Sequence, residues 1–466
     1  MITQLRQTTT KNNFFSKLKT TLASSLLLLS SQASYAANAL GHFSQTYTAA
    51  EIQADLAQWV NWLHSTHPDL THSIDDIDAF YAQIAALRSS ITTPMTGESL
   101  WRELAKLNAT MADGHLSFSA GKYAQWREWV ANGARLFPFE IAINSERLFI
   151  KSKLGGEASP FQGQQITHIN GTPANEVLSA LLKRTEGDNL AFRKALLSLR
   201  FPMIYRMQYG QQDNFEVTLA TENTSTTLSL SALNIAPYSI KVKPFEHYFN
   251  LQLLEDQQAI LTVKSFGWDE PRKYFQFMEQ AFKKIKANNT QHLLIDISEN
   301  TGGDDIYWMD GILKYIAQQP YKQGSHYIGK ILAKYRDPGE VIGSVVTGSL
   351  TRMIQPEKNH SLLYTGKVSV ITGPLTYSSA VLFANTIQDH QFAKLIGTPT
   401  GGRSTQSGGI QFLTLKNTQF SAVAPRFVLA RPSGEKQMTP VQPDIALTHD
   451  ALDDTSLIKQ ALTQQL

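Results

Sequence analysis

Cysteine is absent from all 466 residues of the sequence. This absence excludes disulfide bonds, a thiol nucleophile, thiolate metal sites and a lipid-anchored cysteine. The chain must therefore hold its fold through packed apolar cores, and it is long enough for two or three domains. With 42% hydrophobic and 17% charged residues, its composition is that of an ordinary globular protein.

Motifs that would assign several other functions are missing too. The sequence contains neither a His-Glu-x-x-His zinc motif nor a Gly-x-x-x-x-Gly-Lys-Ser/Thr phosphate loop, and its 12 histidines are scattered. We therefore expect no metal site and no cofactor. The basic residues form no patch or stripe of the kind that contacts phosphates, so we expect no nucleic-acid partner.

The first 36 residues differ from the rest of the chain. They are positively charged, and no acidic residue precedes Glu51. The short apolar run Leu22–Leu29 follows, and then Ser34–Ala36 fits a small-x-small cleavage site. This pattern predicts a cleavable signal peptide over 1–36 and a periplasmic or secreted protein; an amphipathic surface helix is the alternative.

Long hydrophobic runs are also lacking. The apolar part of the predicted signal is too short to span a bilayer, and no later stretch reaches the length of a membrane helix. We expect no membrane span in the mature chain. Because the predicted signal carries four positive and no negative charges, its removal changes the formal net charge from +3 to about −1.

Three zones are predicted after the signal. Residues 45–130 show a helical pattern, in which apolar residues recur at helical spacing at Leu100, Leu104, Leu107 and Met111. This helix leads into Asp113-Gly114-His115, and Gly114 is a plausible helix stop. We therefore expect His115 to lie on a loop just beyond the helix.

Short β-type runs dominate residues 135–240. The segment 163–174 is typical of a strand, a tight Asn170-Gly171 turn and a helix that begins at Ala174. It resembles the corresponding part of a PDZ domain, a module that binds peptides by adding a strand to its sheet. Any other small β-rich insert remains the alternative.

Strands and helices alternate over residues 245–447. This alternation predicts an α/β domain in which a mixed β-sheet is layered with helices. The expected strands are 259–263, 293–297, 368–372 and 394–396, and the expected helices include 274–285 and 378–387.

Two turns in this domain contain candidate catalytic groups. The strand 368–372 ends in a Gly-Pro turn, and a helix begins at or just after Ser378, so the serine hydroxyl lies beside free N–H groups at the helix start. Such groups can hold a developing oxyanion, although a serine here can also simply cap the helix. The strand 293–297 leads to Gly302 and Gly303, whose N–H groups can approach the same oxyanion or form an ordinary turn.

Taken together, these segments resemble the catalytic domain of the tail-specific protease family, peptidase family S41. The resemblance covers residues 245–447, in the family's usual order after a helical region and a degenerate PDZ-like region. It implies a serine-type peptidase acting on peptides or proteins, with Ser378 as nucleophile and oxyanion N–H groups from Ser379 and from Gly302 or Gly303. The matching motifs are Asn300-x-Gly302-Gly303, Ser378-Ser379-Ala380, Gln388-Asp389, Gly397-x-Pro399-Thr400-Gly401-Gly402, Gly434 and Pro443-Asp444.

The catalytic base distinguishes two branches of this family. One branch uses a Ser–Lys dyad, but the position of that lysine falls on Arg403, which stays protonated and cannot act as a base. The tricorn-core-like branch uses a histidine, often in an Asp-Gly-His context, which Asp113-Gly114-His115 matches. The resemblance therefore implies His115 as the general base.

A catalytic histidine is normally oriented by another polar group. In the tricorn-like branch a serine precedes the histidine and a distant glutamate supports it; here Gly114 occupies the position of that serine. We predict Glu435 as the orienting carboxylate, with Asp113 and Glu299 as alternatives.

The sequence thus predicts an exported serine peptidase. Two other functions stay open. A ligand- or peptide-binding protein on the same scaffold is compatible with Ser298, Arg403 and Gly114, at which the sequence departs from the family pattern. An esterase using the same serine would need the same oxyanion contacts.

Overall fold

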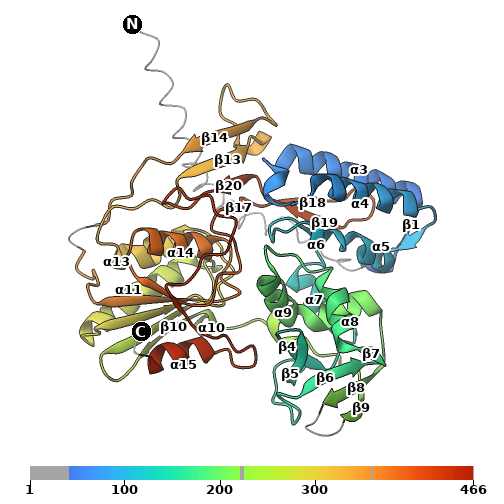
Figure 1. Cartoon of the computed structure of the whole chain (residues 1–466), viewed down its shortest axis with the longest axis horizontal. Helices are drawn as coiled ribbons and strands as arrows, with labels where there is room; N and C mark the ends of the chain where they lie inside the picture. Colours follow the sequence, from blue (N-terminus) through green and yellow to red (C-terminus); the bar gives the residue numbers. More distant parts are fainter. Residues whose placement is uncertain (1–40, 221–224, 358–359, 465–466) are drawn as a thin grey trace.

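The computed structural model describes residues 41–220, 225–357 and 360–464. The predicted signal peptide over 1–36 lies outside the described residues. The described chain has mixed α/β architecture, and Figure 1 shows an α/β layer on one side and a helical and a β-rich region on the other.

The C-terminal part is built on a six-stranded sheet. All its strands are parallel to their neighbours except β10, which is antiparallel to β11. In spatial order the strands are β10 Phe249–Leu253, β11 Gln258–Val263, β12 His292–Asp296, β15 Lys367–Thr372, β16 Lys394–Gly397 and β21 Ile445–Ala446. The four strands expected from the sequence are all present.

Both faces of this sheet are covered, as near-continuous apolar strands require. One face packs against α11 (Pro271–Ala287) and α14 (Ser379–Asp389), and the other face against α15 (Ser456–Thr463). Successive residues of β12 serve the two faces in turn: Leu293 belongs to the first core and Leu294 to the second. A short helical run, α12 Ile306–Trp308, the π-helical turn Met309–Leu313 and α13 Lys314–Ile316, follows the loop after β12.

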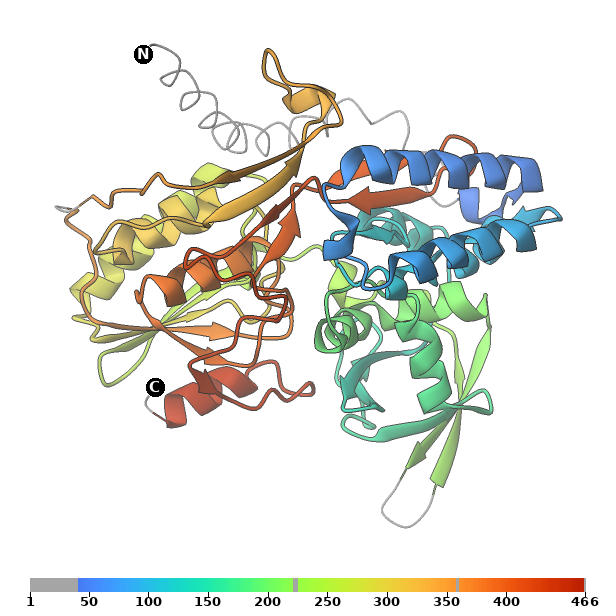
Figure 2. The ribbon, with the colours of Figure 1, turned by 45° about the horizontal axis from the view of Figure 1, so that its top comes forward.

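Two smaller antiparallel sheets extend from this domain. The first has the order β14 Val345–Ser349, β13 His326–Lys330, β20 Phe427–Leu429 and β17 Gln406–Gly408. The second contains β18 Gln411–Thr414, β19 Ser421–Ala424 and β3 Ser117–Phe118. Because β19 pairs with β3, the second sheet joins the C-terminal part of the chain to the segment that follows His115. Figure 2 shows the β18–β19 hairpin alongside the N-terminal helices.

Helices dominate the N-terminal part. They are α2 Gly41–Ser44, α3 Ala49–Thr66, α4 Ile77–Ser90, α5 Gly97–Leu104, α6 Leu107–Thr110 and α7 Tyr123–Ala131, with the short paired strands β1 Thr46–Tyr47 and β2 Met95–Thr96. Thr48 and Glu51 form a capping box at the start of α3. The single helix that the apolar spacing predicted through Leu100–Met111 is divided at residues 105–106 into α5 and α6.

The next region combines a twisted β-sheet with two helices. Its strands are β4 Phe139–Asn144, β5 Arg147–Lys153, β6 Gln165–Ile169, β7 Thr172–Pro173, β8 Asn214–Ala220 and β9 Ser225–Ser231. Helix α8 (Ala174–Leu182) begins where the sequence predicted it, but α9 (Leu190–Tyr209) is a 20-residue helix in a region expected to be mainly β. One hydrophobic core runs through this region, the N-terminal helices and the β18–β19 hairpin.

Candidate active site

Ser378 lies at the sharp turn between β15 and α14. Its backbone has φ +55° and ψ −125°, a left-handed conformation that is unfavourable for a residue with a Cβ. Its side chain makes no capping hydrogen bond in the described structure, so helix capping does not account for this serine. A strained strand-to-helix turn that presents a free hydroxyl is the usual setting of a serine nucleophile in α/β hydrolases.

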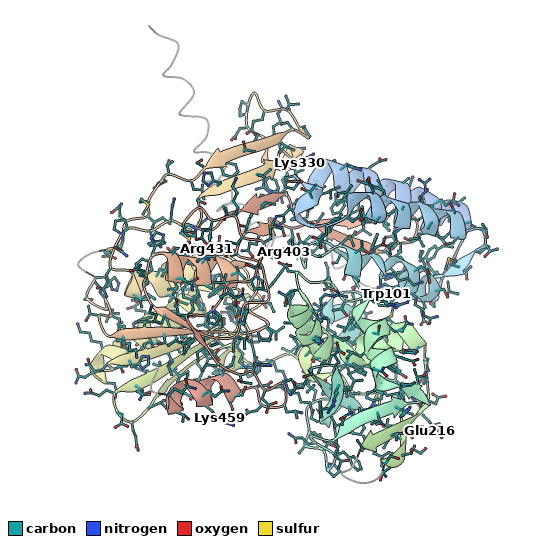
Figure 3. The ribbon with its side chains drawn as sticks, viewed as in Figure 1. Trp101, Glu216, Lys330, Arg403, Arg431 and Lys459 are labelled. Atoms are coloured by element: carbon teal, nitrogen blue, oxygen red, sulfur yellow. The ribbon has the colours of Figure 1, made fainter. Side chains whose placement is uncertain are left out.

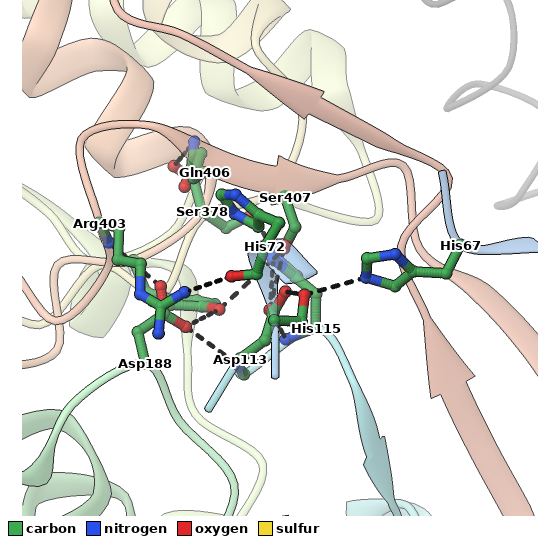
Figure 4. A network of polar contacts seen from close by, with 12 residues as sticks. His67, His72, Asp113, His115, Asp188, Ser378, Arg403, Gln406 and Ser407 are labelled. Carbon is green, nitrogen blue, oxygen red and sulfur yellow. Dashed lines mark hydrogen bonds and ion pairs between the residues drawn. The ribbon is translucent and has the colours of Figure 1, made fainter. Parts of the chain in front are cut away.

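The histidine predicted as the base lies next to this hydroxyl. His115 Nε2 is 3.0 Å from Ser378 Oγ, although 263 residues separate the two in sequence. His115 sits on a loop after α6, as expected, and is 7% exposed. Figure 4 shows the pair at the centre of a network of polar side chains from distant segments.

The hydrogen-bond network determines the tautomer of His115. Ser407 Oγ donates to Asp113 Oδ1 at 2.9 Å, so its oxygen can only accept from His115 Nδ1, at 3.0 Å. Tyr377 Oη likewise donates to Asp188 Oδ1 at 2.7 Å and lies 3.3 Å from the same Nδ1. Because both hydroxyl protons are committed to carboxylates, Nδ1 carries the imidazole proton. Nε2 then presents its lone pair to the nucleophile, as a general base requires.

Asp113 is the first of the two carboxylates. It is 2% exposed and accepts hydrogen bonds from the His115 N–H at 2.8 Å, from Ser407 and from Ser73 Oγ at 2.6 Å. Burial raises its pKa, but nearby His115 and His72 and the Ser73 hydrogen bond together outweigh burial and lower it to about 2. Asp113 is therefore ionised and can stabilise positive charge on the catalytic imidazole.

A second histidine supports Asp113 from the opposite side. His67 Nδ1 accepts from the Asp69 N–H at 3.2 Å, so the ring proton is on Nε2, which lies 2.9 Å from Ser73 Oγ. The Ser73 hydroxyl in turn donates a hydrogen bond to Asp113. Burial lowers the pKa of His67 to about 4, so this ring is neutral near pH 7.

Asp188 is the second carboxylate. It accepts from the Gly114 N–H at 2.8 Å, from Tyr377 Oη at 2.7 Å and from the Arg403 N–H at 3.1 Å. Burial, followed by the charge of the neighbouring Asp113, raises its pKa. The Tyr377 ring stacks on Phe192, at a centroid distance of 4.2 Å, and also contacts the His115 imidazole, at 4.8 Å.

The glycine before His115 has a steric role. A Cβ on Gly114 would lie 2.7 Å from Tyr377 Oη. Glycine here lets Tyr377 reach His115 and Asp188, so a serine at this position would collide with the tyrosine hydroxyl.

Of the paired glycines, Gly302 lies directly against Ser378, whereas Gly303 packs against the Phe266 backbone. A Cβ on Gly302 would be 2.6 Å from the Ser378 Cβ and 2.9 Å from the Ser379 nitrogen. The Gly302 N–H itself donates to Asn300 Oδ1 at 2.8 Å. Within the described residues, the Gly303 and Ser379 N–H groups have no assigned acceptor. Of the two glycines that the sequence left open, Gly303 is therefore the one with a free donor.

The prediction that Glu435 orients His115 is wrong for this structure. Glu435 is exposed, and its backbone carbonyl accepts from Thr405 Oγ1 at 3.4 Å. Ser407 Oγ lies beside His115 Nδ1 and links the imidazole to Asp113. Asp113 was one of the two alternatives for the orienting carboxylate. The other alternative, Glu299, pairs instead with Lys264 at 2.8 Å.

Arg403 does not contact the nucleophile but ties regions of the chain together. Its guanidinium donates to the His72 carbonyl at 2.6 Å, and its backbone N–H donates to Asp188. Gln406 Nε2 donates to the Ser378 carbonyl at 2.9 Å. Ser407, Asp188 and Ser73 were not found from the sequence, because none lies in a motif that the sequence displays.

Comparisons with known proteins identify a family match for part of the chain and similar folds for most of it. Residues 257–447 match the family model described as peptidase family S41. The fold is similar to that of mature CPAF, with 13% identity, a TM-score of 0.63 and coverage of 90% of this chain and 98% of that chain. It is similarly close to mature CPAF complexed with lactacystin, with 13% identity, a TM-score of 0.61 and coverage of 90% and 99%.

A more distant likeness is to the photosystem II D1 C-terminal processing protease, with 14% identity, a TM-score of 0.44 and coverage of 88% and 96%. A search of curated protein sequences finds no match. Within the described residues, no helix is both long and apolar enough to cross a membrane. Residues 257–447 accordingly form a domain that matches peptidase family S41, a family of serine-type peptidases.

Proposed function

We propose that this peptidase hydrolyses peptide bonds with Ser378 as nucleophile and His115 as general base. The observation that carries the proposal is the 3.0 Å contact between His115 Nε2 and Ser378 Oγ, in the tautomer that leaves Nε2 free to accept a proton. An unassisted serine hydroxyl is a weak nucleophile near pH 7, and a histidine at this distance activates it.

Each step then uses a group described above. Ser378 Oγ attacks the substrate carbonyl carbon while its proton passes to His115 Nε2. The carbonyl oxygen, now negatively charged, accepts from the N–H groups of Gly303 and Ser379. His115 returns its proton to the leaving nitrogen, the C–N bond breaks, and an acyl-enzyme remains. A water molecule, deprotonated by His115, then attacks the ester carbon. The ester C–O bond breaks, His115 returns the proton to Ser378 Oγ, and the acid product leaves.

The two carboxylates assist when the imidazole becomes positively charged. Asp113 acts through the Ser407 hydroxyl, and Asp188 acts through the Tyr377 hydroxyl. These contacts support an assignment to the histidine-using, tricorn-core-like branch of the family. A lysine base is ruled out chemically, since the corresponding residue is Arg403.

Export and peptide presentation belong to the same proposal. The pattern of residues 1–36 supports cleavage after Ala36 and release into the periplasm or medium. The β4–β9 region supports a PDZ-like role in presenting or gating the peptide chain. N-terminal sequencing of the protein recovered from the expressing cells tests export, and we expect Ala37 as the first residue.

The catalytic assignment is tested by labelling the purified protein with a fluorophosphonate, which reacts only with activated serines. We expect labelling of the wild type and a loss of at least about a thousandfold in rate for Ser378→Ala and His115→Ala. Both variants should fold, because each replacement removes side-chain atoms and adds none to the packed site.

Peptide and ester substrates are compared in parallel with the labelling. Cleavage of a casein digest that is lost in Ser378→Ala supports a peptidase. Turnover of simple esters without any peptide cleavage would indicate an esterase. A folded wild type that is neither labelled nor active would instead indicate a binding protein on this scaffold.

A further inference from the structure

The catalytic histidine forms part of the wall of a cavity of about 300 Å³. Most of its lining is apolar and comes from both sides of the junction between the N-terminal helices and the β-rich region. Figure 3 marks Trp101 of α5 at this junction. The apolar lining includes Trp101, Phe118, Trp126, Met203, Ile204 and Val423.

Large apolar side chains are also exposed among the lining residues. Phe412 is 65% exposed, Ile410 is 42% exposed and Tyr123 is 37% exposed. Exposed apolar groups beside a buried apolar cavity are typical of a ligand-binding site. Ile410 and Phe412 follow Ser407 closely in the chain, so this part of the lining is attached to the catalytic network.

The cavity borders the base rather than the oxyanion donors. Its lining includes Gly114, His115 and Ser117, whereas Ser378, Gly303 and Ser379 do not line it. In acyl transfer the oxyanion donors hold the acyl half of the substrate, and the histidine protonates the leaving nitrogen. Because His115 lines the cavity and the oxyanion donors do not, we expect the cavity on the leaving-group side of the scissile bond.

The charges around the cavity disfavour a basic ligand. Arg200 forms an ion pair with Glu186, and Arg184 donates to the Ala180 carbonyl at 2.8 Å. With Lys122, the lining carries three cationic side chains and one carboxylate. A lysine or arginine side chain entering the cavity would meet a net positive charge.

We propose that this cavity is the specificity pocket for the substrate residue that immediately follows the scissile bond. It selects a large apolar side chain, such as phenylalanine or leucine, and rejects lysine and arginine. At about 300 Å³ the cavity lies at the lower end of the range for small-ligand pockets, about 300–1,000 Å³, and is large enough for one aromatic side chain. The inference rests on the proposed function, because the orientation of the substrate follows from the roles of Ser378 and His115.

A set of matched fluorogenic peptides tests this selectivity. The peptides differ only at the residue after the cleaved bond, which is phenylalanine, leucine, glycine or lysine, and mass spectrometry identifies the bond. We expect kcat/KM for phenylalanine and leucine to exceed that for glycine by roughly ten- to a hundredfold, with lysine lowest. Equal rates across the set, or a preference that follows the residue before the bond, would overturn the proposal.

A cavity-filling variant connects this preference to the pocket. Ala120→Phe adds a ring to the lining, while the Ala120 backbone carbonyl keeps its hydrogen bond from Trp126. We expect the ratio of phenylalanine to glycine kcat/KM to fall at least about tenfold. This ratio is independent of the fraction of active enzyme, so partial misfolding cannot produce the result.

The matched control is Ile342→Ala, which alters an exposed apolar residue (53% exposed) that does not line the cavity. It should leave the ratio unchanged. An unchanged ratio in Ala120→Phe would overturn the pocket assignment while fluorophosphonate labelling and peptide cleavage still supported the Ser378–His115 mechanism. Loss of labelling in the wild type itself would overturn both.

Discussion

At the scale of single residues, the site depends on how hydroxyl protons are distributed. Ser407 and Tyr377 each donate to an ionisable carboxyl group, and each is then left with only an acceptor toward His115 Nδ1. The serine contact at 3.0 Å is shorter than the tyrosine contact at 3.3 Å, so Ser407 is the stronger of the two positioning groups.

Replacing Ser407 by alanine should therefore impair the base without removing it. His115 Nδ1 is 3.8 Å from Asp113 Oδ1, too far for a direct hydrogen bond, so the tautomer would be held by Tyr377 alone. We expect the fluorophosphonate labelling rate to fall by roughly ten- to a hundredfold and Ser407→Thr to restore most of it. A labelling rate equal to the wild type in Ser407→Ala would show that Ser407 does not position the histidine.

The ionisation of Asp113 predicts a pH dependence of stability. Its pKa in the folded protein is lowered to about 2 from an ordinary 3.8, so the carboxylate stabilises the fold above the ordinary value. This contribution, about 2–3 kcal/mol, is lost as the pH falls from about 4 to about 2. Denaturant unfolding of the wild type and Asp113→Asn should show a stability difference that shrinks over this range. A difference independent of pH would contradict the assigned ionisation.

These residue roles divide into those with a sequence signal and those without. Ser378 and His115 lie in recognisable motifs, and both take the positions that their motifs predicted. Ser407 lies 292 residues from His115, and Asp188 lies 189 residues from Tyr377. A serine or an aspartate outside a motif does not reveal its role in the sequence, because the roles of Ser407 and Asp188 arise only from tertiary contacts. The prediction of Glu435 follows the tricorn-like branch, in which a distant glutamate supports the histidine, and no local pattern in this sequence tests it.

At the scale of elements, periodicity predicted most of the α/β domain. Buried parallel strands are continuous apolar runs, and α11 has one apolar face, so both give clear signals. Helix α9 gave no such signal, because it is buried on several sides and contains Pro202. Its sequence therefore lacks a single apolar stripe, and its helical state depends on packing in the core that it shares with α8 and β4.

The contact between the Gly302 turn and the start of α14 can be tested with a matched pair of glycines. Gly302 has φ +101° and lies against Ser378 and Ser379, whereas Gly339 has φ +90° with no heavy atom within 4 Å of an added Cβ. Alanine should destabilise the protein by about 1 kcal/mol at Gly339 through backbone strain alone. Gly302→Ala should destabilise it more and lower the labelling rate by roughly a hundred- to a thousandfold. Equal labelling rates in the two variants would place the oxyanion contacts elsewhere.

At the scale of the whole molecule, the site exists only where separate parts of the chain meet. The base and Asp113 belong to the N-terminal region, Asp188 to the β-rich region, and Ser378 and Ser407 to the C-terminal domain. The β18–β19 hairpin leaves the C-terminal domain, enters the N-terminal core and pairs with β3, close to His115. We therefore expect activity to depend on the docking of this hairpin.

Asp55 of α3 binds the turn of the β18–β19 hairpin through hydrogen bonds. It is 2% exposed and accepts from the Asn417 side-chain amide at 2.8 Å, from the Thr418 N–H at 2.7 Å and from Thr418 Oγ1 at 2.7 Å. Replacing Asp55 by alanine leaves these buried donors unsatisfied, which should destabilise the protein by about 2–4 kcal/mol. Since the hairpin also positions β3, labelling of Ser378 should disappear at a lower denaturant concentration than in the wild type.

Asp453→Ala is the matched control, because Asp453 is only half-buried and its side chain, among the described residues, bonds to nearby Thr455 and Lys459 alone. A surface carboxylate with local partners contributes little, so this variant should behave as the wild type. Tryptophan fluorescence and fluorophosphonate labelling, measured across the same denaturant series, separate the two effects. If Asp55→Ala lowered the fluorescence midpoint but labelling persisted beyond it, the Ser378–His115 pair would not depend on hairpin docking. If both signals fell together, and earlier than in Asp453→Ala, the coupling between docking and catalysis would be established.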